Sequence, residues 1–337
     1  MKKIEKSKKT NLFKKIFIKF CRIVGFEIID QSNFSSPSLG KNLNETLSIQ
    51  GKKSITIPLG QIDIKKKVKS LKIIVRTCTS ELIMDQNKKR IFDCEKSEYT
   101  FRMLKSLIKA TNKAKKKFEN INFELIVTDS NSPDKDIEKI KEIVKESSIK
   151  NRVIPINLNE FKNKIKDKYS KAKFSNMANF YNSLLIAKNE EADLIYFVED
   201  DYLHKRNSIK EMIFTYERIS SQINSEIIIC PADYPYLYAK TEATLNFLGH
   251  KSHWRKVGET LCTFLTSKQI IEKYWDKYVS MCQREHAPFE KPMHEIYERE
   301  LCISPIPSLA VHFTNINSIF GLSPNMDWKK IWDENEN

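Results

Sequence analysis

Three consecutive carboxylates, Glu199, Asp200 and Asp201, directly follow a run of apolar residues, Leu194 to Val198. Such a run predicts a buried central strand, and ligands of open α/β sheets bind beyond the carboxyl ends of these strands. Neighbouring carboxylates repel one another unless a cation is close, and a hard divalent ion prefers their oxygens together with substrate phosphates. The cluster therefore predicts a site for Mn²⁺ or Mg²⁺. The alternative is an acidic helix start, because a helix is expected to begin near Ser208.

The segments around this cluster alternate between strand and helix patterns from residue 71 onward. Such alternation is typical of an α/β fold whose mostly parallel central sheet is flanked by helices. We expect strands at 72–77, 123–128, 153–156, 193–198 and 225–230, and helices at 99–117, 136–147 and 177–187. The expected parts of the chain are a basic amphipathic N-terminal helix (1–30), a linker or stem (31–70), a catalytic domain (71–325) and a C-terminal tail (326–337).

The carboxylate cluster resembles the aspartate-x-aspartate signature of A-type-fold glycosyltransferases, in a Glu-Asp-Asp variant. The order of elements over residues 71–325 resembles that of family 2 enzymes. The resemblance implies a nucleotide-diphospho-sugar transferase fold in which Asp201 binds the metal ion, while Glu199 and Asp200 contact the nucleotide sugar. The ion would act as a Lewis acid on the departing nucleotide.

The same resemblance implies contacts to the nucleoside. The end of the first strand offers Arg76, Thr77 and Thr79 to the base or ribose. Asp129, after the second strand, would accept a hydrogen bond from a uracil-type base. A plain Asx turn at Asp129 is the alternative.

Two further donor contacts are expected from later elements. The helix before the acidic strand often carries an asparagine near the donor, and Asn179 is the candidate, with Asn176 and Asn182 as alternatives. Arg255, in a hairpin-like segment at 250–266, is the expected clamp for the diphosphate.

Inverting sugar transfer needs a carboxylate that takes the proton of the acceptor hydroxyl. The resemblance places it near the start of a helix before the last core strand, where we expect Glu295, with Glu298 as the alternate. The Asp that usually follows is replaced by Ile296, and solvated helix carboxylates are the competing interpretation. His312, in the strand-like segment 303–313, is the expected second metal ligand, with a structural histidine as the alternative.

The positive charge of the chain is concentrated at its N-terminus. The net charge is +15, and residues 1–70 hold 16 Lys/Arg against 5 Asp/Glu, which is +11. No recognised nucleic-acid motif is present, so we expect no nucleic-acid partner. A basic amphipathic helix within residues 12–29 predicts either peripheral contact with an anionic membrane or packing on the domain, and both remain open.

The cysteines and the apolar runs bear on localisation. Seven cysteines, an odd number without a CxxC pair, favour reduced thiols in the cytoplasm. No stretch approaches the about 20 apolar residues of a spanning helix. We therefore expect a cytoplasmic protein; the membrane alternative for residues 12–29 would place it at the inner face of the membrane.

These observations predict a metal-dependent glycosyltransferase that moves a sugar from a nucleoside diphosphate donor, with UDP favoured, to a hydroxyl of a glycan or lipid-linked acceptor. A sugar nucleotidyltransferase is an alternative, but it needs a glycine-rich loop after the first strand, and residues 76–80 contain no glycine. A non-catalytic basic module that binds membrane or nucleic acid is the alternative from a different class. A glycosidase would need two separated acids.

Overall fold

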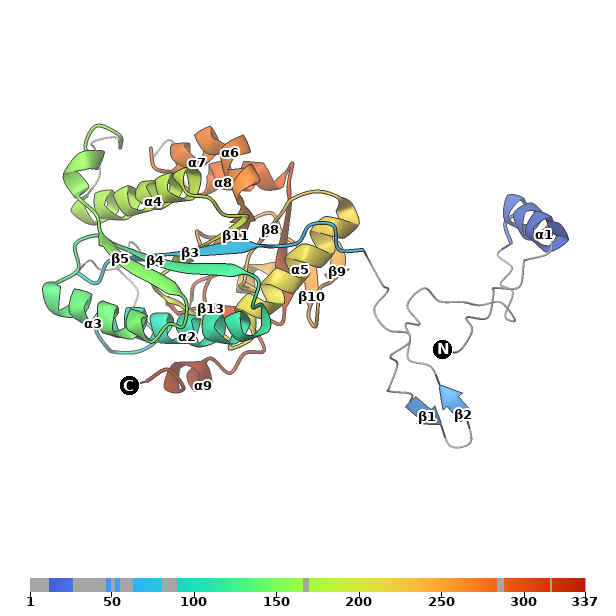
Figure 1. Cartoon of the computed structure of the whole chain (residues 1–337), viewed down its shortest axis with the longest axis horizontal. Coiled ribbons are helices and arrows are strands. Elements are labelled where there is room, and N and C mark those ends of the chain that lie inside the picture. The colour runs from blue at the N-terminus through green and yellow to red at the C-terminus, as the bar shows by residue number, and fades with distance from the viewer. Residues whose placement is uncertain are drawn as a thin grey trace. The chain divides into compact units, whose positions relative to one another are not determined.

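The computed structural model describes residues 12–26, 47–49, 52–54, 63–80, 90–165, 170–283, 288–315 and 317–336. The chain divides into two compact units, Met1–Ile62 and Asp63–Asn337, which we call the N-terminal unit and the α/β unit. The N-terminal unit contains helix α1 (Leu12–Ile23) and an antiparallel pair of strands, β1 (Leu47–Ile49) and β2 (Lys52–Ser54) (Figure 1). No helix of the described residues is both long and apolar enough to cross a bilayer.

A nine-stranded sheet forms the centre of the α/β unit, in the order β5-β4-β3-β6-β11-β8-β12-β10-β9. Seven of the strands run in one direction, and only β11 and β10 run in the other. The strands are β3 (Ser70–Thr77), β4 (Asn122–Asp129), β5 (Lys150–Pro155), β6 (Leu194–Glu199), β8 (Ile227–Ile229), β9 (Asn246–Leu248), β10 (His253–Lys256), β11 (Phe264–Ser267) and β12 (Leu301–Ile306). A separate pair, β7 (Tyr202–His204) and β13 (Ala310–His312), is antiparallel.

Helices cover both faces of this sheet (Figure 1). One face carries α2 (Lys96–Lys117), α3 (Asp134–Lys145), α5 (Ser208–Ile223) and α9 (Trp328–Asp333). The other carries α4 (Lys171–Asn189), α6 (Lys268–Lys273), α7 (Trp275–Met281) and α8 (Lys291–Tyr297). The expected α/β class, with a large and mostly parallel central sheet flanked by helices, is confirmed.

Strand β6 shows why the sequence gives this arrangement. Side chains of a strand alternate between the two faces of a sheet. Tyr196 and Val198 therefore join the apolar core on the α2 side, while Ile195 and Phe197 join the core on the α4 side. Because both faces are buried, the strand must be apolar throughout until it reaches the acidic cluster.

The order of strands creates a crevice at one point of the sheet. The chain runs from β3 outward through β4 to β5, and then returns to the other side of β3 to form β6. The order thus reverses between β3 and β6, and open α/β sheets bind ligands at the carboxyl ends of the strands at such a switch point. Thr77 and Glu199, which end the two strands, lie at this position.

Several boundaries differ from those expected. The segment 303–313 is two strands, because β12 belongs to the large sheet and β13 pairs with β7. Segment 250–266 is not a hairpin, since β10 pairs with β9 and β12, whereas β11 pairs with β6 and β8.

The ends of the α/β unit also extend beyond the expected catalytic domain. The unit starts at Asp63, where the backbone N–H groups of Lys65 and Lys66 donate to the Ser221 hydroxyl of α5. In the C-terminal segment, the Trp332 ring stacks on Phe92 with centroids 4.3 Å apart, so this segment packs on the unit. Residues 1–11, 27–46, 50–51 and 55–62 of the expected helix and linker lie outside the described residues, and with them residues 27–29 of the expected membrane segment.

Candidate active site

A cavity of about 350 Å³ opens at the switch point between β3 and β6. Its walls come from the ends of these strands, from α2, α4 and the start of α8, and from the segment that follows β13. The residues that line it are Arg76, Thr77, Cys78, Lys96, Ser130, Ala172, Asn176, Asn179, Glu199, Asp200, Asp201, Leu261, Phe289, Glu290, His312, Thr314, Ser318 and Phe320. The structure therefore brings together eight of the residues that the sequence nominated for the site: Arg76, Thr77, Asn179, Glu199, Asp200, Asp201 and His312, with Asn176, which was an alternative to Asn179.

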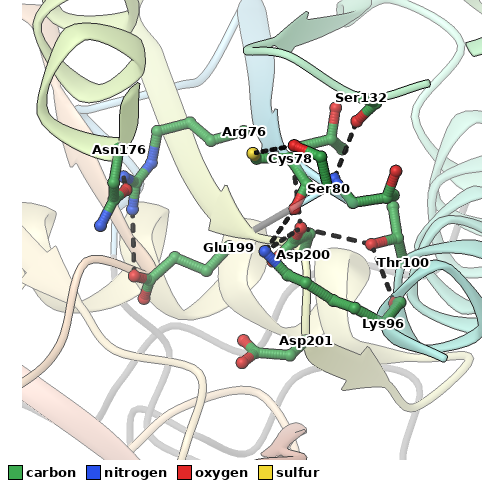
Figure 2. Close-up of polar contacts among 12 residues, drawn as sticks. Arg76, Cys78, Ser80, Lys96, Thr100, Ser132, Asn176, Glu199, Asp200 and Asp201 are labelled. Carbon is green, nitrogen blue, oxygen red and sulfur yellow. Dashed lines mark hydrogen bonds and ion pairs between the residues drawn. The ribbon is translucent and has the colours of Figure 1, made fainter. Parts of the chain in front are cut away.

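Each carboxylate of the acidic cluster lies beside its own basic side chain, and Figure 2 shows those of Glu199 and Asp200. Arg76 Nη2 lies 3.1 Å from Glu199 Oε1, and Lys96 Nζ lies 3.5 Å from Asp200 Oδ2. His312 Nε2 lies 3.3 Å from Asp201 Oδ2. These basic groups offset part of the mutual repulsion of the three adjacent acids.

Asp200 also holds the loop after β3 in place. Its Oδ2 accepts hydrogen bonds from the backbone N–H of Cys78 at 3.2 Å and from the Thr100 hydroxyl at 3.2 Å (Figure 2). Lys96 donates to the Cys78 carbonyl oxygen as well. Asp200 thus links the loop after β3 to α2 at the wall of the cavity.

The Glu199 carboxylate lies between a buried arginine and β11. The Arg76 guanidinium also donates to Asn176 Oδ1 at 3.0 Å and lies over the Phe180 ring, with Cζ 4.8 Å from the centroid. Burial raises the pKa of Glu199, while the charge of Arg76 opposes that rise. The Thr263 hydroxyl is a further neighbour, because it accepts from the Glu199 backbone N–H at 3.0 Å.

The Asp201 and His312 side chains form a pair whose hydrogen-bonding roles are fixed. His312 Nδ1 lies 2.7 Å from the Phe320 carbonyl oxygen, which can only accept, so Nδ1 carries a proton and Nε2 faces Asp201. The ring stacks on Tyr202 at 4.5 Å and 5°. Burial acts to raise the pKa of Asp201, but His312 outweighs it and the net pKa is lowered; burial acts to lower the pKa of His312, and Asp201 raises it overall.

The same pair fits a divalent ion. Metal-bound histidines commonly donate their other ring N–H to a backbone carbonyl, as His312 does to Phe320. Two ligands in neighbouring octahedral positions at about 2.1 Å from an ion are about 3.0 Å apart, close to the 3.3 Å between Nε2 and Oδ2. Among the described residues no group of three His, Cys, Asp or Glu side chains forms a metal-binding set. With two protein ligands, such an ion would take its remaining oxygens from a substrate and water.

Other nominated donor residues are engaged within the protein. Asp129 accepts from the Thr77 hydroxyl at 2.6 Å and from the N–H and hydroxyl of Ser132, which is the geometry of an Asx turn, and burial raises its pKa. The Thr79 hydroxyl donates to Asp136 at 2.6 Å. Asn179 Nδ2 donates to the carbonyl oxygens of Thr77 and Thr128. Of these residues, Asp129 and Thr79 do not line the cavity, and neither does Asn182.

Arg255, Glu295 and Glu298 also lie outside this cavity. The Arg255 guanidinium is paired with the buried Asp233 and lies over Tyr238, with Cζ 4.4 Å from the ring centroid. Glu295 forms an ion pair with Lys277. Both Glu295 and Glu298 line a second cavity, of about 760 Å³.

Glu290 is the acid that the sequence interpretation missed. It lies at the start of α8 and lines both cavities, which share only Glu290, Leu261 and Phe320. Its side chain is buried, and burial raises its pKa to about 7, with the charge of Glu199 acting in the same direction. A sequence signal was present, because Pro292 favours the first turn of a helix and so marks Glu290 as the acid at the helix start.

Comparisons with known proteins give distant matches only among solved structures. No model of a known protein family and no curated protein matches the sequence. The chain is similar to S. aureus TarS 1–349 in complex with UDP, at 13% identity over 70% of this chain and 57% of that chain, with a TM-score of 0.39. The chain spans 35% to 57% of the length of the TarS chains that it matches.

Two further matches are described as glycosyltransferases. WbbM, a bifunctional glycosyltransferase, matches at 9% identity over 69% of this chain and 36% of that chain, with a TM-score of 0.34. LgtC, a galactosyltransferase in complex with donor and acceptor sugar analogues, matches at 10% identity over 63% of this chain and 64% of that chain, with a TM-score of 0.33. At this level of likeness, function has to be argued from the geometry of the site itself.

Proposed function

We propose that the protein is a metal-dependent glycosyltransferase that uses a nucleoside diphosphate sugar, with UDP favoured as the nucleotide. The observation that carries this proposal is the acidic cluster at the switch point, where Asp201 and His312 face each other beside a cavity of about 350 Å³. A single acid–imidazole pair leaves most ligand positions of a hard ion to the oxygens of a diphosphate.

Asp201 and His312 would hold the Mn²⁺ or Mg²⁺ ion. When bound, the ion would supply Lewis-acid stabilisation of the negative charge on the departing diphosphate. Asp200 keeps the loop after β3 in position through the Cys78 N–H, and Lys96 adds a positive charge to the same wall. Arg76 keeps the Glu199 carboxylate at the carboxyl end of β6, where Glu199 can accept hydrogen bonds from sugar hydroxyls.

Glu290 is the residue that we assign as the general base, in place of the expected Glu295. A base works best when its pKa lies near the working pH, and the pKa of Glu290 is about 7. In the reaction, the acceptor oxygen forms its bond to the anomeric carbon, its proton passes to Glu290, and the bond to the nucleoside diphosphate breaks. Attack from the side opposite the leaving group inverts the configuration.

The second cavity is the proposed place of the acceptor. It shares the Glu290 wall with the first cavity, so that a hydroxyl bound there would lie beside the base. Its lining mixes the basic residues Lys256, Lys291 and His294 with glutamates, which suits a polyhydroxyl saccharide. We assign a growing glycan or a lipid-linked saccharide as the acceptor, on the cytoplasmic side.

Calorimetric titration of the purified protein with UDP and GDP, with and without Mn²⁺, tests the proposal. We expect one nucleoside diphosphate to bind in a metal-dependent manner, and Asp201→Ala to abolish that binding. The matched control is Asp276→Ala, on the exposed surface of α7. Metal-independent binding, or no binding of any nucleotide, would contradict the proposal and favour a non-catalytic module.

A further inference from the structure

Helix α1 of the N-terminal unit exposes most of its large apolar side chains. Phe17 and Phe20 are 59% and 60% exposed, and Ile23 is 76% exposed. Eight of the thirteen exposed large apolar side chains of the described residues lie between Leu12 and Phe26. A contiguous apolar surface of this kind marks an interaction site rather than ordinary surface composition.

These side chains lie on one side of the helix. At about 100° per residue, the exposed large apolar positions of α1 occupy an arc of roughly 140°. These positions are Leu12, Phe13, Ile16, Phe17, Phe20 and Ile23. The four basic positions, 14, 15, 19 and 22, fall on the remaining arc. Ile18, which is half-buried, and Cys21, which is buried, also fall on that remaining arc, so the exposed apolar side chains share one side of the helix while the other side is mixed.

The charge around α1 identifies the kind of surface that it fits. Residues 1–26 contain nine Lys/Arg and one Glu. A basic segment with an apolar face that includes phenylalanines is complementary to a bilayer that contains anionic lipids, because the rings enter the headgroup region while the cations remain at the phosphates. The 12 residues of α1 are about 18 Å long, too short for a hydrocarbon core of about 30 Å, so the helix can lie in the surface but cannot span it.

The α/β unit offers no matching apolar surface. Its exposed large apolar side chains, among the described residues, are Ile223, Tyr238, Leu245, Leu248 and Ile319, which come from several separate segments. Scattered side chains of this kind are normal on a protein surface. A bilayer can contact the whole length of the apolar side of α1, so it fits this side better than scattered side chains do.

We propose that α1 is a reversible anchor that lies in the surface of a membrane containing anionic lipids, with its Phe17–Phe20 side inserted. Binding that combines a short apolar face with basic residues depends on both parts, so it weakens as salt rises or as the anionic lipid content falls. Only the purpose of the anchor rests on the proposed function: it would keep the enzyme close to a lipid-linked acceptor.

Flotation of the full chain with phosphatidylcholine vesicles, with and without phosphatidylglycerol, tests the anchor. We expect binding to the anionic vesicles only, reduced by high salt, and weakened about tenfold or more in a Phe17→Ser, Phe20→Ser double variant. The matched control is Ile223→Ser, Leu248→Ser, which removes two exposed apolar side chains of the α/β unit and should bind like the unmodified chain.

Each other outcome of the flotation experiment overturns the anchor. The anchor is overturned if the chain does not bind anionic vesicles, or if both double variants lose binding equally. It is also overturned if the chain forms a dimer that dissociates on Phe17→Ser, Phe20→Ser, because the apolar arc of α1 would then face a second copy of the chain. Metal-dependent UDP binding is measured on the same samples. Helix α1 does not line the cavity. If the unmodified chain binds UDP but no vesicles, the anchor has failed and the proposed function has not. If it binds anionic vesicles but no UDP, the proposed function has failed and the anchor has not.

Discussion

The acids at the end of β6 and the acid at the start of α8 line the same cavity but have opposite surroundings. Arg76, Lys96 and His312 lie beside the three acids, and at Asp201 the pair with His312 lowers the pKa, whereas burial raises the pKa of Glu290 to about 7. A paired carboxylate stays charged and can hold a ligand or an ion, while a buried one can take up and release a proton near neutral pH. Similar residue types thus acquire two roles from their environment.

Removal of the charge at Asp201 is the most severe test of this difference. Asp201→Asn keeps the side-chain shape but loses the anionic metal ligand, so we expect kcat/KM to fall roughly a thousandfold, which corresponds to about 4 kcal/mol. Steady-state kinetics with a radiolabelled nucleotide sugar would measure it. An Asn variant that retains activity over a range of Mn²⁺ concentrations would refute the metal-binding role.

Replacement of Glu290 should remove the proton acceptor while leaving donor binding intact. For Glu290→Gln we expect kcat to fall about 100-fold to 1,000-fold with the affinity for UDP unchanged. Activity of the unmodified protein should rise with pH toward about 7 as Glu290 ionises, and this limb should vanish in the variant. Glu295→Gln is the discriminating comparison: if it causes the larger loss, then the base is Glu295 and our assignment is wrong.

His312 should affect the ion more than the nucleotide. His312→Gln removes the imidazole that faces Asp201, so we expect Mn²⁺ affinity to weaken at least about tenfold, measured by titration followed by electron paramagnetic resonance. His294→Gln is the control, because that ring binds the Thr260 carbonyl oxygen at 2.9 Å outside the first cavity. Equal losses in both variants would indicate a general structural effect.

The smallest expected effect concerns stability. Since the pKa of Glu290 in the folded protein is above its usual value of 4.5, the folded state binds the proton more tightly, and stability is lost as pH rises from about 4.5 to about 7. Glu290→Gln removes this dependence and should be more stable than the unmodified protein by roughly 2–3 kcal/mol at pH 8, but not at pH 4. Urea unfolding at the two pH values would measure it.

Glu300 provides the matched control for that stability measurement. It is also buried, but Lys273 and the Tyr274 hydroxyl both lie 2.7 Å from its Oε1. Glu300→Gln breaks an ion pair, so it should bring no gain at pH 8. A gain of similar size in both variants would show that the effect is not specific to Glu290.

The sequence interpretation was informative where one element sets both position and chemistry. Strand β6 had to be buried on both faces, so the acids after it had to lie at the carboxyl edge of the sheet. The same local argument placed Thr77 at the end of β3 beside the cavity. It gave no partner for Asp200, because Lys96 arrives from a distant part of the chain, whereas His312 beside Asp201 was expected only from the family resemblance.

The interpretation was weaker where polar residues compete for several partners. Asp129 and Arg255 carry suitable side chains, but the first is engaged by Ser132 and Thr77 and the second by Asp233. Glu295 and Glu290 differ by five positions in one acidic region, but Glu290 is buried and lines the first cavity, whereas Glu295 lies outside it and forms an ion pair with Lys277. Hydrogen-bond partners and burial depend on packing between elements, which residue spacing does not encode.

The sequence by itself determined the alternation of strands and helices, the acidic cluster at a strand end and the amphipathic pattern of α1, because each follows from the local period of apolar residues. The tertiary structure alone decided which cation faces which acid, that Glu290 joins two cavities, and that Arg255 lies elsewhere. The physical reason is that electrostatic environment and burial arise from residues far apart in the chain, brought together when β3 and β6 pair.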